Sequence, residues 1–344
     1  MTRQTRSASP YEVVYDPVRP ELARVVANVV ALGEEESVRE DAVAGHLAHV
    51  LEAPGKRLRP AITLLAARLW GKPSDLDVTM ATGVELLHIA TLIHDDTVDG
   101  ADLRRGQPTP SSLWGRNVAV LLGDYVFAAA ARFVCDTNSV RLVRRFAETI
   151  MELSRGELNE LLDGRTGSVT RAAYFRRIYD KTASLFTTAA ESGAILGDGS
   201  EADIRRLRDF GYNLGMAYQV QDDVLDFEST PEEMGKPAGA DLRAGVLTLP
   251  AIMLIEQEPE WAGMLAALAD AGLGDDHPPE READRRSGLA EAITRIRDSG
   301  AVEESCRVAQ GYVDSAREAI QGLPESPECA ALQTLADMTE TRRS

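Results

Sequence analysis

The chain has 344 residues, a formal net charge of −18 at pH 7 and an isoelectric point of about 4.8. Such an acidic chain repels nucleic acid and anionic lipid surfaces, so nucleic acid is excluded as a partner unless cations gather locally. Hydrophobic residues make up 44% of the chain and aromatic residues only 5%, which predicts a sizeable core of aliphatic side chains.

Helical patterns follow one another along most of the chain, and no stretch alternates like a strand. Residues 1–17 are expected to form a loose, flexible arm. The predicted helices cover residues 20–52 with a break near Gly33, then 59–70, 75–99, 118–135, 140–162, 171–196, 201–227 and 247–256. Loops are expected at 100–112, 228–245 and 272–288, where Gly, Pro and charged residues gather. No linker separates independent cores, so the prediction is an all-α protein with one helical domain over residues 18–344.

The cysteines and the apolar segments bear on location. The three cysteines are scattered and have no metal-type spacing, which indicates reduced thiols. The first residues do not resemble a signal peptide, and no apolar run is expected to reach the roughly 18 residues of a membrane span. A cytoplasmic location is therefore predicted.

Two acidic motifs of the form DDxxD dominate the sequence. One is Asp95-Asp96-Thr-Val-Asp99 and the other is Asp222-Asp223-Val-Leu-Asp226, and each ends a long apolar helical stretch. Residues four apart share one face of a helix, where like charges repel. A single copy is as consistent with a solvated acidic turn, but two copies at the ends of core helices indicate binding of hard cations. Without Cys or His donors, Mg²⁺ is the expected ion, and Mn²⁺ is expected to substitute for it.

Cationic residues gather near the first motif. The segment GKRLRP over residues 55–60 places Lys56 and Arg59 at the start of a helix, and Arg104 and Arg105 follow the motif closely. Helix N-termini and arginine side chains both bind phosphate groups. Each cluster alone could be a solvated surface, but their position beside a metal-type motif favours anion binding.

Three further residues are weaker candidates taken singly. His88, two turns before Asp95, is by itself more often a core residue than a ligand. Thr182 and Gln219 look ordinary, whereas Lys181 lies within an apolar helical pattern, and a buried lysine needs an anionic partner.

Taken together, these segments resemble the polyprenyl synthetase family, in particular its long-chain bacterial branch. The resemblance spans roughly residues 20–340 and rests on six ordered motifs. They are GKRLRP at 55–60, ELLHIATLIHDDTVDGADLRRGQPT at 85–109, GDYVF at 123–127, RGEL at 155–158, YDKTASLF at 179–186 and GMAYQVQDDVLDFESTPEEMGKPAGADLRAGVLTLP at 215–250.

The resemblance implies a fold, a reaction and a set of roles. The expected fold is a bundle of mostly antiparallel helices around a central cavity, in a homodimer. The expected reaction joins isopentenyl diphosphate to an allylic diphosphate by ionisation, condensation and proton loss. Isopentenyl diphosphate would be held by Lys56, Arg59, His88 and Arg105. The allylic diphosphate would be held by Arg104, Lys181, Thr182, Gln219 and Lys236. Mg²⁺ on the allylic diphosphate would be bound by Asp95, Asp96, Asp99 and Asp222, and Asp223 and Asp226 would complete the second site.

Two departures from the family pattern concern binding and product length. Val246 stands where many short-chain members carry a second lysine, which implies one cation fewer at the allylic phosphate. Small residues, Ala90 and Thr91, stand where short-chain members place a bulky aromatic, with Leu86 and Leu87 a further turn back. The resemblance thus implies a long product, about six to ten isoprene units, which would bring at most peripheral membrane contact.

Four other functions were weighed against this one. A geranylgeranyl diphosphate synthase is the nearest alternative. A class I terpene cyclase would leave GKRLRP and Arg105 unexplained, because it needs no second diphosphate site. A subunit of a heteromeric synthase would tend to lose its acidic motifs, and a Ca²⁺-binding protein would need a spacing that is absent here.

Overall fold

The structure is a computed structural model that describes residues 10–37, 41–71, 73–163, 170–228, 238–271 and 279–341. Its α-carbon contacts divide the chain into two compact units. Unit 1 comprises residues 1–149, 185–211 and 320–335, and unit 2 comprises residues 150–184, 212–319 and 336–344.

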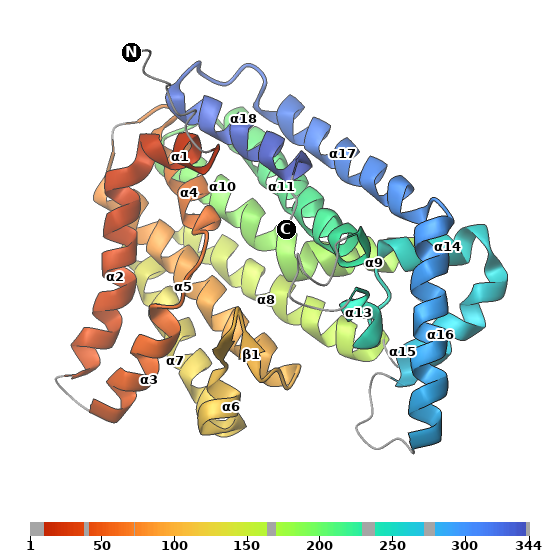
Figure 1. Ribbon diagram of the computed structural model, residues 1–344. Helices are drawn as coiled ribbons and strands as arrows, with labels where there is room; N and C mark the ends of the chain where they lie inside the picture. The colour runs from red at the N-terminus through yellow and green to blue at the C-terminus, as the bar shows by residue number, and fades with distance from the viewer. Residues whose placement is uncertain are drawn as a thin grey trace, which may run out of the picture. The chain divides into compact units, whose positions relative to one another are not determined.

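Unit 1 is built around one long buried helix, α5 (Asp75–Val98). It packs along α7 (Arg116–Asp136) and also contacts α2 (Arg19–Ser37) and α4 (Leu58–Arg68) (Figure 1). The start of α5 is fixed by a capping box, in which Ser74 and Asp77 each satisfy the other's backbone N–H. Gly83 allows the close approach of α7, because a Cβ there would lie 2.9 Å from Val134 Cγ2.

The other elements of unit 1 cover this pair. They are α1 (Pro10–Tyr15), η1 (Asp16–Val18), α3 (Asp41–Leu51), β1 (Leu103–Arg104), β2 (Gln107–Pro108), α6 (Pro110–Trp114), most of α10 (Ser184–Leu196) and the first parts of α8 (Val140–Asp163), α11 (Glu201–Glu228) and α18 (Pro327–Glu340).

Unit 2 has its own aliphatic core, centred on α14 (Leu249–Gln257) and the second half of α11. Its other elements are α9 (Arg171–Ile178), the π-helical turn η2 (Tyr179–Ala183), α13 (Ala240–Arg243), η3 (Pro259–Trp261), α15 (Ala262–Ala271), α16 (Pro279–Asp298) and nearly all of α17 (Ala301–Ile320). Buried Met216, Val220 and Val224 place one face of α11 in this core.

The all-α prediction is confirmed, and the predicted helices begin and end within about two residues of their predicted bounds. The break predicted near Gly33 is wrong, since α2 runs through Gly33 to Ser37. The predicted helix over 171–196 is interrupted by the π-helical turn, and α16 begins at Pro279, so the last ten residues of the predicted loop over 272–288 are helical. Pro279 at its first position favours that start, since proline lacks only an N–H that a first turn leaves without a partner. The two short strands are a hairpin that the sequence pattern did not indicate.

The N-terminal segment also differs from its prediction. Residues 10–18 are helical, and Val14 and Val18 are fully buried, so this part of the expected arm packs against unit 1. Arg68 fastens it, donating to the Pro17 carbonyl at 2.6 Å. The single domain over residues 18–344 stays a prediction.

Two helices, α5 and α7, are long and apolar enough to cross a membrane by length and composition, contrary to expectation. For α5 the apolar window is 72% buried within the fold, which explains its composition as that of a core helix. For α7 the corresponding window is 39% buried, and Val118, Val120 and Leu121 are exposed on its surface.

Candidate active site

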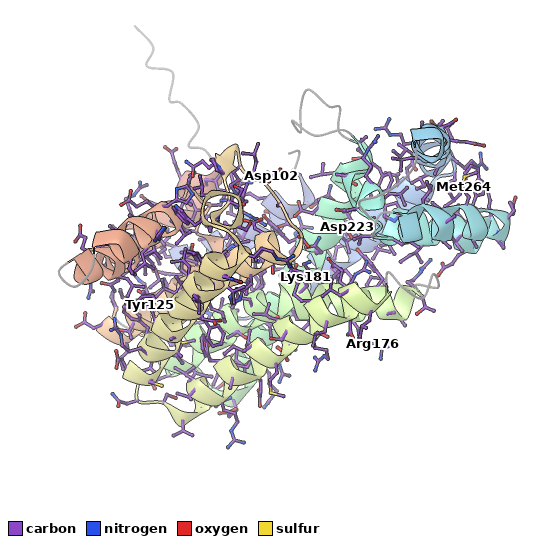
Figure 2. The ribbon with its side chains drawn as sticks, turned by 90° about the horizontal axis from the view of Figure 1, so that it is seen from below. Asp102, Tyr125, Arg176, Lys181, Asp223 and Met264 are labelled. Carbon is purple, nitrogen blue, oxygen red and sulfur yellow. The ribbon has the colours of Figure 1, made fainter. Side chains whose placement is uncertain are left out.

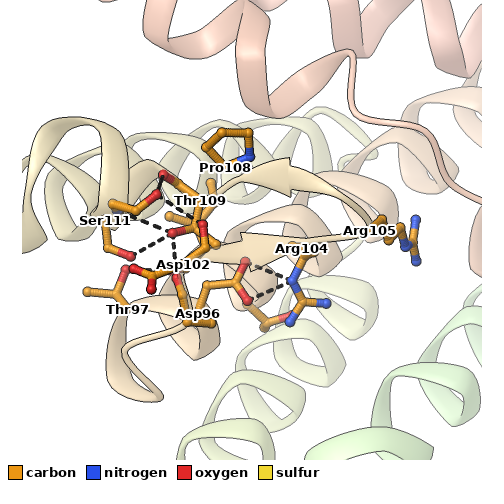
Figure 3. A network of polar contacts seen from close by, with 12 residues as sticks. Asp96, Thr97, Asp102, Arg104, Arg105, Pro108, Thr109 and Ser111 are labelled. Atoms are coloured by element: carbon orange, nitrogen blue, oxygen red, sulfur yellow. Dashed lines mark hydrogen bonds and ion pairs between the residues drawn. The ribbon is translucent and has the colours of Figure 1, made fainter. Parts of the chain in front are cut away.

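The first acidic motif lies at the C-terminal end of α5 in unit 1. Asp95 is half-buried, Asp96 is buried, and Asp99 is the exposed C-cap of the helix, where its N–H donates to the Asp95 carbonyl at 2.8 Å. Arg104 Nε donates to both carboxylate oxygens of Asp96 at 2.7 Å (Figure 3). The middle aspartate of this motif therefore pairs with an arginine of the same unit.

A tight hairpin carries the two arginines that follow the motif. β1 and β2 pair antiparallel, with Arg104 opposite Gln107, and Arg105 and Gly106 form the turn at φ of 50° and 78°. Two positive φ angles in a two-residue loop are the signature of a type I′ turn, which a glycine tolerates and an arginine adopts only under strain. Thr109 closes the base of the hairpin, donating from Oγ1 to the Ala101 carbonyl at 2.6 Å (Figure 3).

The GKRLRP segment is fastened to its surroundings at three points. Arg57, at a φ of 51°, forms an ion pair with buried Glu85 and donates to the Ala53 carbonyl at 3.1 Å. Arg105 donates to the Pro54 carbonyl. The Tyr15 hydroxyl of α1 donates to the Lys56 carbonyl. The loop that carries Lys56 is thus held by α5, by the hairpin and by the N-terminal segment.

His88 lies among the arginines of this unit. Arg59 Nη1 is 3.2 Å from His88 Nε2, and the Arg59 guanidinium also lies 4.4 Å from the centroid of the Phe186 ring. Burial, followed by the charges of Arg59 and Arg105, lowers the pKa of His88 well below its usual value. A neutral His88 can accept a hydrogen bond from Arg59, so the unit gathers positive charge around an uncharged imidazole.

The residues predicted to set chain length lie on the same helix. Leu86, Leu87 and Ala90 are buried, and Thr91 is half-buried and donates to the His88 carbonyl at 2.8 Å. Ala90 and Thr91 stand one turn before Asp95, as the helical spacing predicted.

The second acidic motif lies on α11 in unit 2 and is more enclosed. Asp222 is half-buried, whereas Asp223 and Asp226 are buried. Asp223 accepts from the Tyr174 hydroxyl at 2.6 Å and from Gln219 Nε2 at 2.8 Å. Asp226 accepts from the backbone N–H groups of Ala240 and Asp241, at 3.0 and 3.2 Å. Asp226 therefore holds the start of α13 beside the motif.

The electrostatics of this motif reflect its burial. Loss of solvation raises the pKa of Asp223 to about 7, although the hydrogen bonds from Tyr174 and Gln219 act in the opposite direction. Burial and the nearby carboxylates of Asp223 and Asp226 raise the pKa of Asp241 well above its usual value. An excess of carboxylates in a desolvated region favours the arrival of cations.

Lys181 and Thr182 lie on the π-helical turn of unit 2 (Figure 2). Lys181 Nζ forms ion pairs with Glu160 at 2.8 Å and with Glu157 at 3.0 Å. Thr182 Oγ1 donates to Gln219 Oε1 at 2.8 Å, and Gln219 in turn donates to Asp223. A hydrogen-bonded chain thus joins the turn to the second motif.

The structure brings most predicted residues into one group in each unit. Unit 1 holds Arg59, His88, Arg104, Arg105 and Asp96, and unit 2 holds Lys181, Thr182, Gln219, Asp222, Asp223 and Asp226. Lys236 lies outside the described residues. Within the described ranges, no group of three or more His, Cys, Asp or Glu side chains could hold a metal ion unaided.

Sequence reasoning missed several residues that support this site. Tyr174, Glu85 and Asp241 contact or lie near predicted residues. Tyr174 lies outside the six motifs, whereas Glu85 and Asp241 stand within the motifs at 85–109 and 215–250 but were given no role there. A buried glutamate within an apolar helical pattern, such as Glu85, was the one available signal, because it requires a cationic partner.

Comparison with known proteins identifies the family of the chain. The family model of the polyprenyl synthetases matches residues 40–275. The chain is 36% identical to heptaprenyl diphosphate synthase component 2 of Geobacillus stearothermophilus, over 84% of this chain and 86% of that protein. It is 34% identical to nonaprenyl diphosphate synthase of Mycobacterium tuberculosis, over 92% of both chains.

A solved structure extends the comparison to the fold. The polyprenyl synthase of Caulobacter crescentus, crystallised with calcium and isoprenyl diphosphate, superposes with a TM-score of 0.86 at 32% identity, covering 99% of this chain and 100% of that chain. The breadth of these matches shows that the chain belongs to the polyprenyl synthetase family.

Proposed function

We propose that the protein is a trans-prenyltransferase that condenses isopentenyl diphosphate with an allylic diphosphate to make a long-chain all-trans polyprenyl diphosphate. The observation that supports the proposal is that unit 1 gathers Arg59 and Arg105 around a neutral His88, in addition to the two DDxxD motifs of the chain. A condensation of two diphosphates needs a cationic site for the second diphosphate, whereas a terpene cyclase does not.

The two substrates are assigned by the charge around each group. In unit 1, Lys56, Arg59, His88 and Arg105 offer cations and a neutral imidazole, which suits isopentenyl diphosphate, a substrate that keeps its diphosphate. In unit 2, Lys181, Thr182 and Gln219 adjoin the carboxylate-rich second motif and suit the allylic diphosphate, which must ionise. Arg104 and Lys236 are assigned to the allylic substrate as well.

The donor set fits Mg²⁺ shared with a substrate. All six motif residues offer carboxylate oxygens, and Mg²⁺ sites typically take one or two carboxylates together with substrate phosphates and water. The absence, among the described residues, of a group of three ligands agrees with coordination completed by the diphosphate. The proposed ligands are all six aspartates of the two motifs, and protein hydrogen bonds or ion pairs position Asp96, Asp223 and Asp226 among them.

The chemistry needs charge stabilisation more than acid–base groups. When bound, Mg²⁺ neutralises the charge that develops on the leaving diphosphate. Lys181 adds fixed positive charge at the allylic diphosphate. Neutral His88 accepts a hydrogen bond from Arg59 and so orients this arginine toward isopentenyl diphosphate. The proton lost after condensation passes to the departing diphosphate.

Product length is proposed to exceed twenty carbons. The relatives are named for heptaprenyl and nonaprenyl products, and the small Ala90 and half-buried Thr91 stand one turn before the first motif. Ala90→Tyr and Thr91→Phe should shift the products toward twenty carbons or fewer while retaining the first condensation. An unmodified enzyme that stops at twenty carbons would instead support a geranylgeranyl diphosphate synthase.

A homodimer is proposed as the functional assembly, in the cytoplasm. Three large apolar side chains are exposed on α7, namely Val118, Val120 and Leu121, and Leu121 is 68% exposed. Exposure of neighbouring apolar side chains to water is unfavourable, so this surface suits an interface between subunits. A heteromeric assembly is the alternative, since one relative is named as a component. Light scattering of the purified chain decides between them, and Leu121→Glu should dissociate a dimer.

The central experiment is an assay of the purified chain with isopentenyl diphosphate, farnesyl diphosphate and Mg²⁺. Elongated prenyl diphosphates support the proposal. A hydrocarbon or alcohol formed from farnesyl diphosphate alone would indicate a cyclase, and activity only after a second protein is added would indicate a component of a heteromeric synthase.

A further inference from the structure

One face of α8 in unit 2 docks onto the π-helical turn that carries Lys181. Arg155 forms a two-bond ion pair with Asp180, from Nε at 2.8 Å and from Nη2 at 2.5 Å. The Asp180 side chain is only 3% exposed, whereas that of Arg155 is 55% exposed. A buried carboxylate is costly without a partner, so this arginine anchors the turn from the solvent side.

Gly156 lets the helix approach the turn at backbone distance. A Cβ at this position would lie 2.8 Å from Lys181 N and 3.1 Å from both the carbonyl carbon and Cβ of Asp180. Contacts below 3.0 Å do not occur for real side chains, so any larger residue must displace the turn. Glycine is therefore required here by the close approach.

Two carboxylates of the same helix hold the lysine itself. Glu157 and Glu160 lie three residues apart, on one face of α8, and both form ion pairs with Lys181 Nζ. All three side chains are about one-fifth to one-quarter exposed, so solvent screens these pairs only partly. A free lysine stem would spread its charge over many rotamers, and the two ion pairs confine it.

We propose that Arg155, Gly156, Glu157 and Glu160 form a dock that sets the position of Lys181 for the allylic diphosphate. They are positioning residues, because they act through Lys181 and not on the substrate. The π-helical turn is part of this dock. Single π-helical turns inserted in α-helices are frequent at functional sites. This turn places Lys181 beside α8 and the next residue, Thr182, beside Gln219. The inference rests on the proposed role of Lys181 in allylic substrate binding.

The first test is Gly156→Ala in the full-length enzyme. The added methyl group should push the turn away from α8 and raise the KM for farnesyl diphosphate about tenfold, a common effect of disturbing a supporting residue. The KM for isopentenyl diphosphate should stay within about twofold of the wild-type value, since Lys181 does not serve that substrate. Gly311→Ala is the matched control, because a Cβ there meets nothing within 4 Å on helix α17.

The second test reads the lysine directly and needs no substrate. The chain has four lysines, Lys56, Lys72, Lys181 and Lys236, so acetylation with limiting reagent can be followed at each by peptide mass spectrometry. In the wild-type protein, the ion pairs should make Lys181 react more slowly than exposed Lys56. In the double variant Glu157→Gln/Glu160→Gln, which keeps the shape of both side chains, the Lys181 rate should rise several-fold while the Lys56 rate stays unchanged.

The outcomes separate the dock from the proposed function. If the wild-type enzyme does not elongate farnesyl diphosphate, the proposed function fails, and the acetylation rates still decide whether the dock holds Lys181. If Lys181→Ala raises the farnesyl diphosphate KM but folded Gly156→Ala does not, the dock is overturned. Equal Lys181 acetylation rates in the wild type and in the double variant would also overturn the dock. This second test does not depend on whether Gly156→Ala folds.

Discussion

The two acidic motifs share one sequence pattern but lie in opposite electrostatic surroundings. Around the first motif, arginines predominate, and burial followed by the charges of these arginines lowers the pKa of His88. Around the second, carboxylates predominate, and burial raises the pKa of Asp223 and of Asp241. The identical spacing therefore does not imply identical tasks: the first region can receive an anion directly, whereas the second needs added cations before it can do so.

Within each motif the three aspartates also divide their roles. The first aspartate of each, Asp95 and Asp222, is half-buried, and the second is positioned by a side chain of its own unit. The third differs between motifs, since Asp99 is exposed at a helix end whereas buried Asp226 holds the backbone of α13.

The largest expected effect comes from removing the first aspartate of either motif. Asp95→Ala and Asp222→Ala should each lower kcat by roughly 10²–10⁴-fold, because metal-assisted charge stabilisation is worth several kcal/mol. Both variants should stay folded, since both side chains are only half-buried. A chelator should abolish wild-type activity and Mg²⁺ should restore it; full activity in chelator would contradict the metal assignment for both motifs.

The next effect separates the two regions by substrate. Arg59→Ala should raise the KM for isopentenyl diphosphate by about 10–100-fold, because a charge-assisted contact to phosphate contributes roughly 1.5–3 kcal/mol. Lys181→Ala should raise the KM for the allylic substrate by a similar factor. Initial rates with each substrate varied in turn measure both constants. A reversed pattern, with Arg59→Ala changing only the allylic KM, would exchange the two assignments.

The parts of this comparison that sequence could predict are the local ones. The helix predicted over 75–99 is found at Asp75–Val98, since a helical hydrophobic pattern and the Ser74–Asp77 cap lie within the segment itself. The spacing of Tyr11, Val14 and Val18 equally indicates a helix within the expected arm, and the structure has one at Pro10–Tyr15.

The parts that sequence could not predict depend on distant contacts. Tyr174 and Asp223 are 49 residues apart, and no motif joins them. The π-helical turn at Tyr179–Ala183 contains neither glycine nor proline, so the usual sequence signals of an interrupted helix are absent there. The opposite surroundings of the two motifs arise partly from such contacts, which the shared DDxxD pattern does not contain.

The third prediction concerns the support of Asp223. Tyr174→Phe removes a hydrogen bond that stabilises the charged carboxylate, so the pKa of Asp223 should rise further and the Mg²⁺ concentration for half-maximal activity should increase about tenfold. Tyr312→Phe, on α17, is the control and should leave the Mg²⁺ requirement unchanged. An unaltered requirement in Tyr174→Phe would mean that Asp223 does not support the metal site.

The fourth prediction uses the opposite pKa shifts to give opposite dependences of stability on pH. The pKa of His88 is lower in the folded protein than in the unfolded chain. As pH falls below about 6.5, the unfolded chain therefore binds a proton at His88 before the folded protein does, and the folded protein loses stability. The folded-state pKa of Asp223 is raised, so its contribution is present at low pH and is lost as pH rises from about 4 toward 7.

Two variants separate these effects in metal-free protein. Relative to wild type, His88→Gln should gain stability as pH is lowered from about 7 to 5.5, and Asp223→Asn should gain stability as pH is raised over the same interval. Each slope should approach about 1 kcal/mol per pH unit, below the limit of about 1.4 for one proton. Urea unfolding at several pH values measures the free energy of unfolding of each variant relative to wild type. If these differences changed with pH in the same direction for both variants, the two motifs would not lie in opposite electrostatic surroundings.

The smallest expected effect tests how the two regions hold their lysines. Lys181 is held through its ammonium by two carboxylates, whereas Lys56 is held through its backbone carbonyl by the Tyr15 hydroxyl. Tyr15→Phe removes only that neutral hydrogen bond, worth about 1 kcal/mol at most, so the KM for isopentenyl diphosphate should rise about threefold with an unchanged allylic KM.

Tyr11→Phe provides the matched control for this last variant. It keeps the ring whose centroid lies 5.6 Å from Lys56 Nζ, and it should therefore leave both constants unchanged. If Tyr15→Phe raised both KM values together, the hydroxyl would be stabilising unit 1 as a whole. If it raised only the isopentenyl diphosphate KM, the N-terminal segment would belong to the anion-binding region, because the GKRLRP loop is the part of that region which Tyr15 contacts.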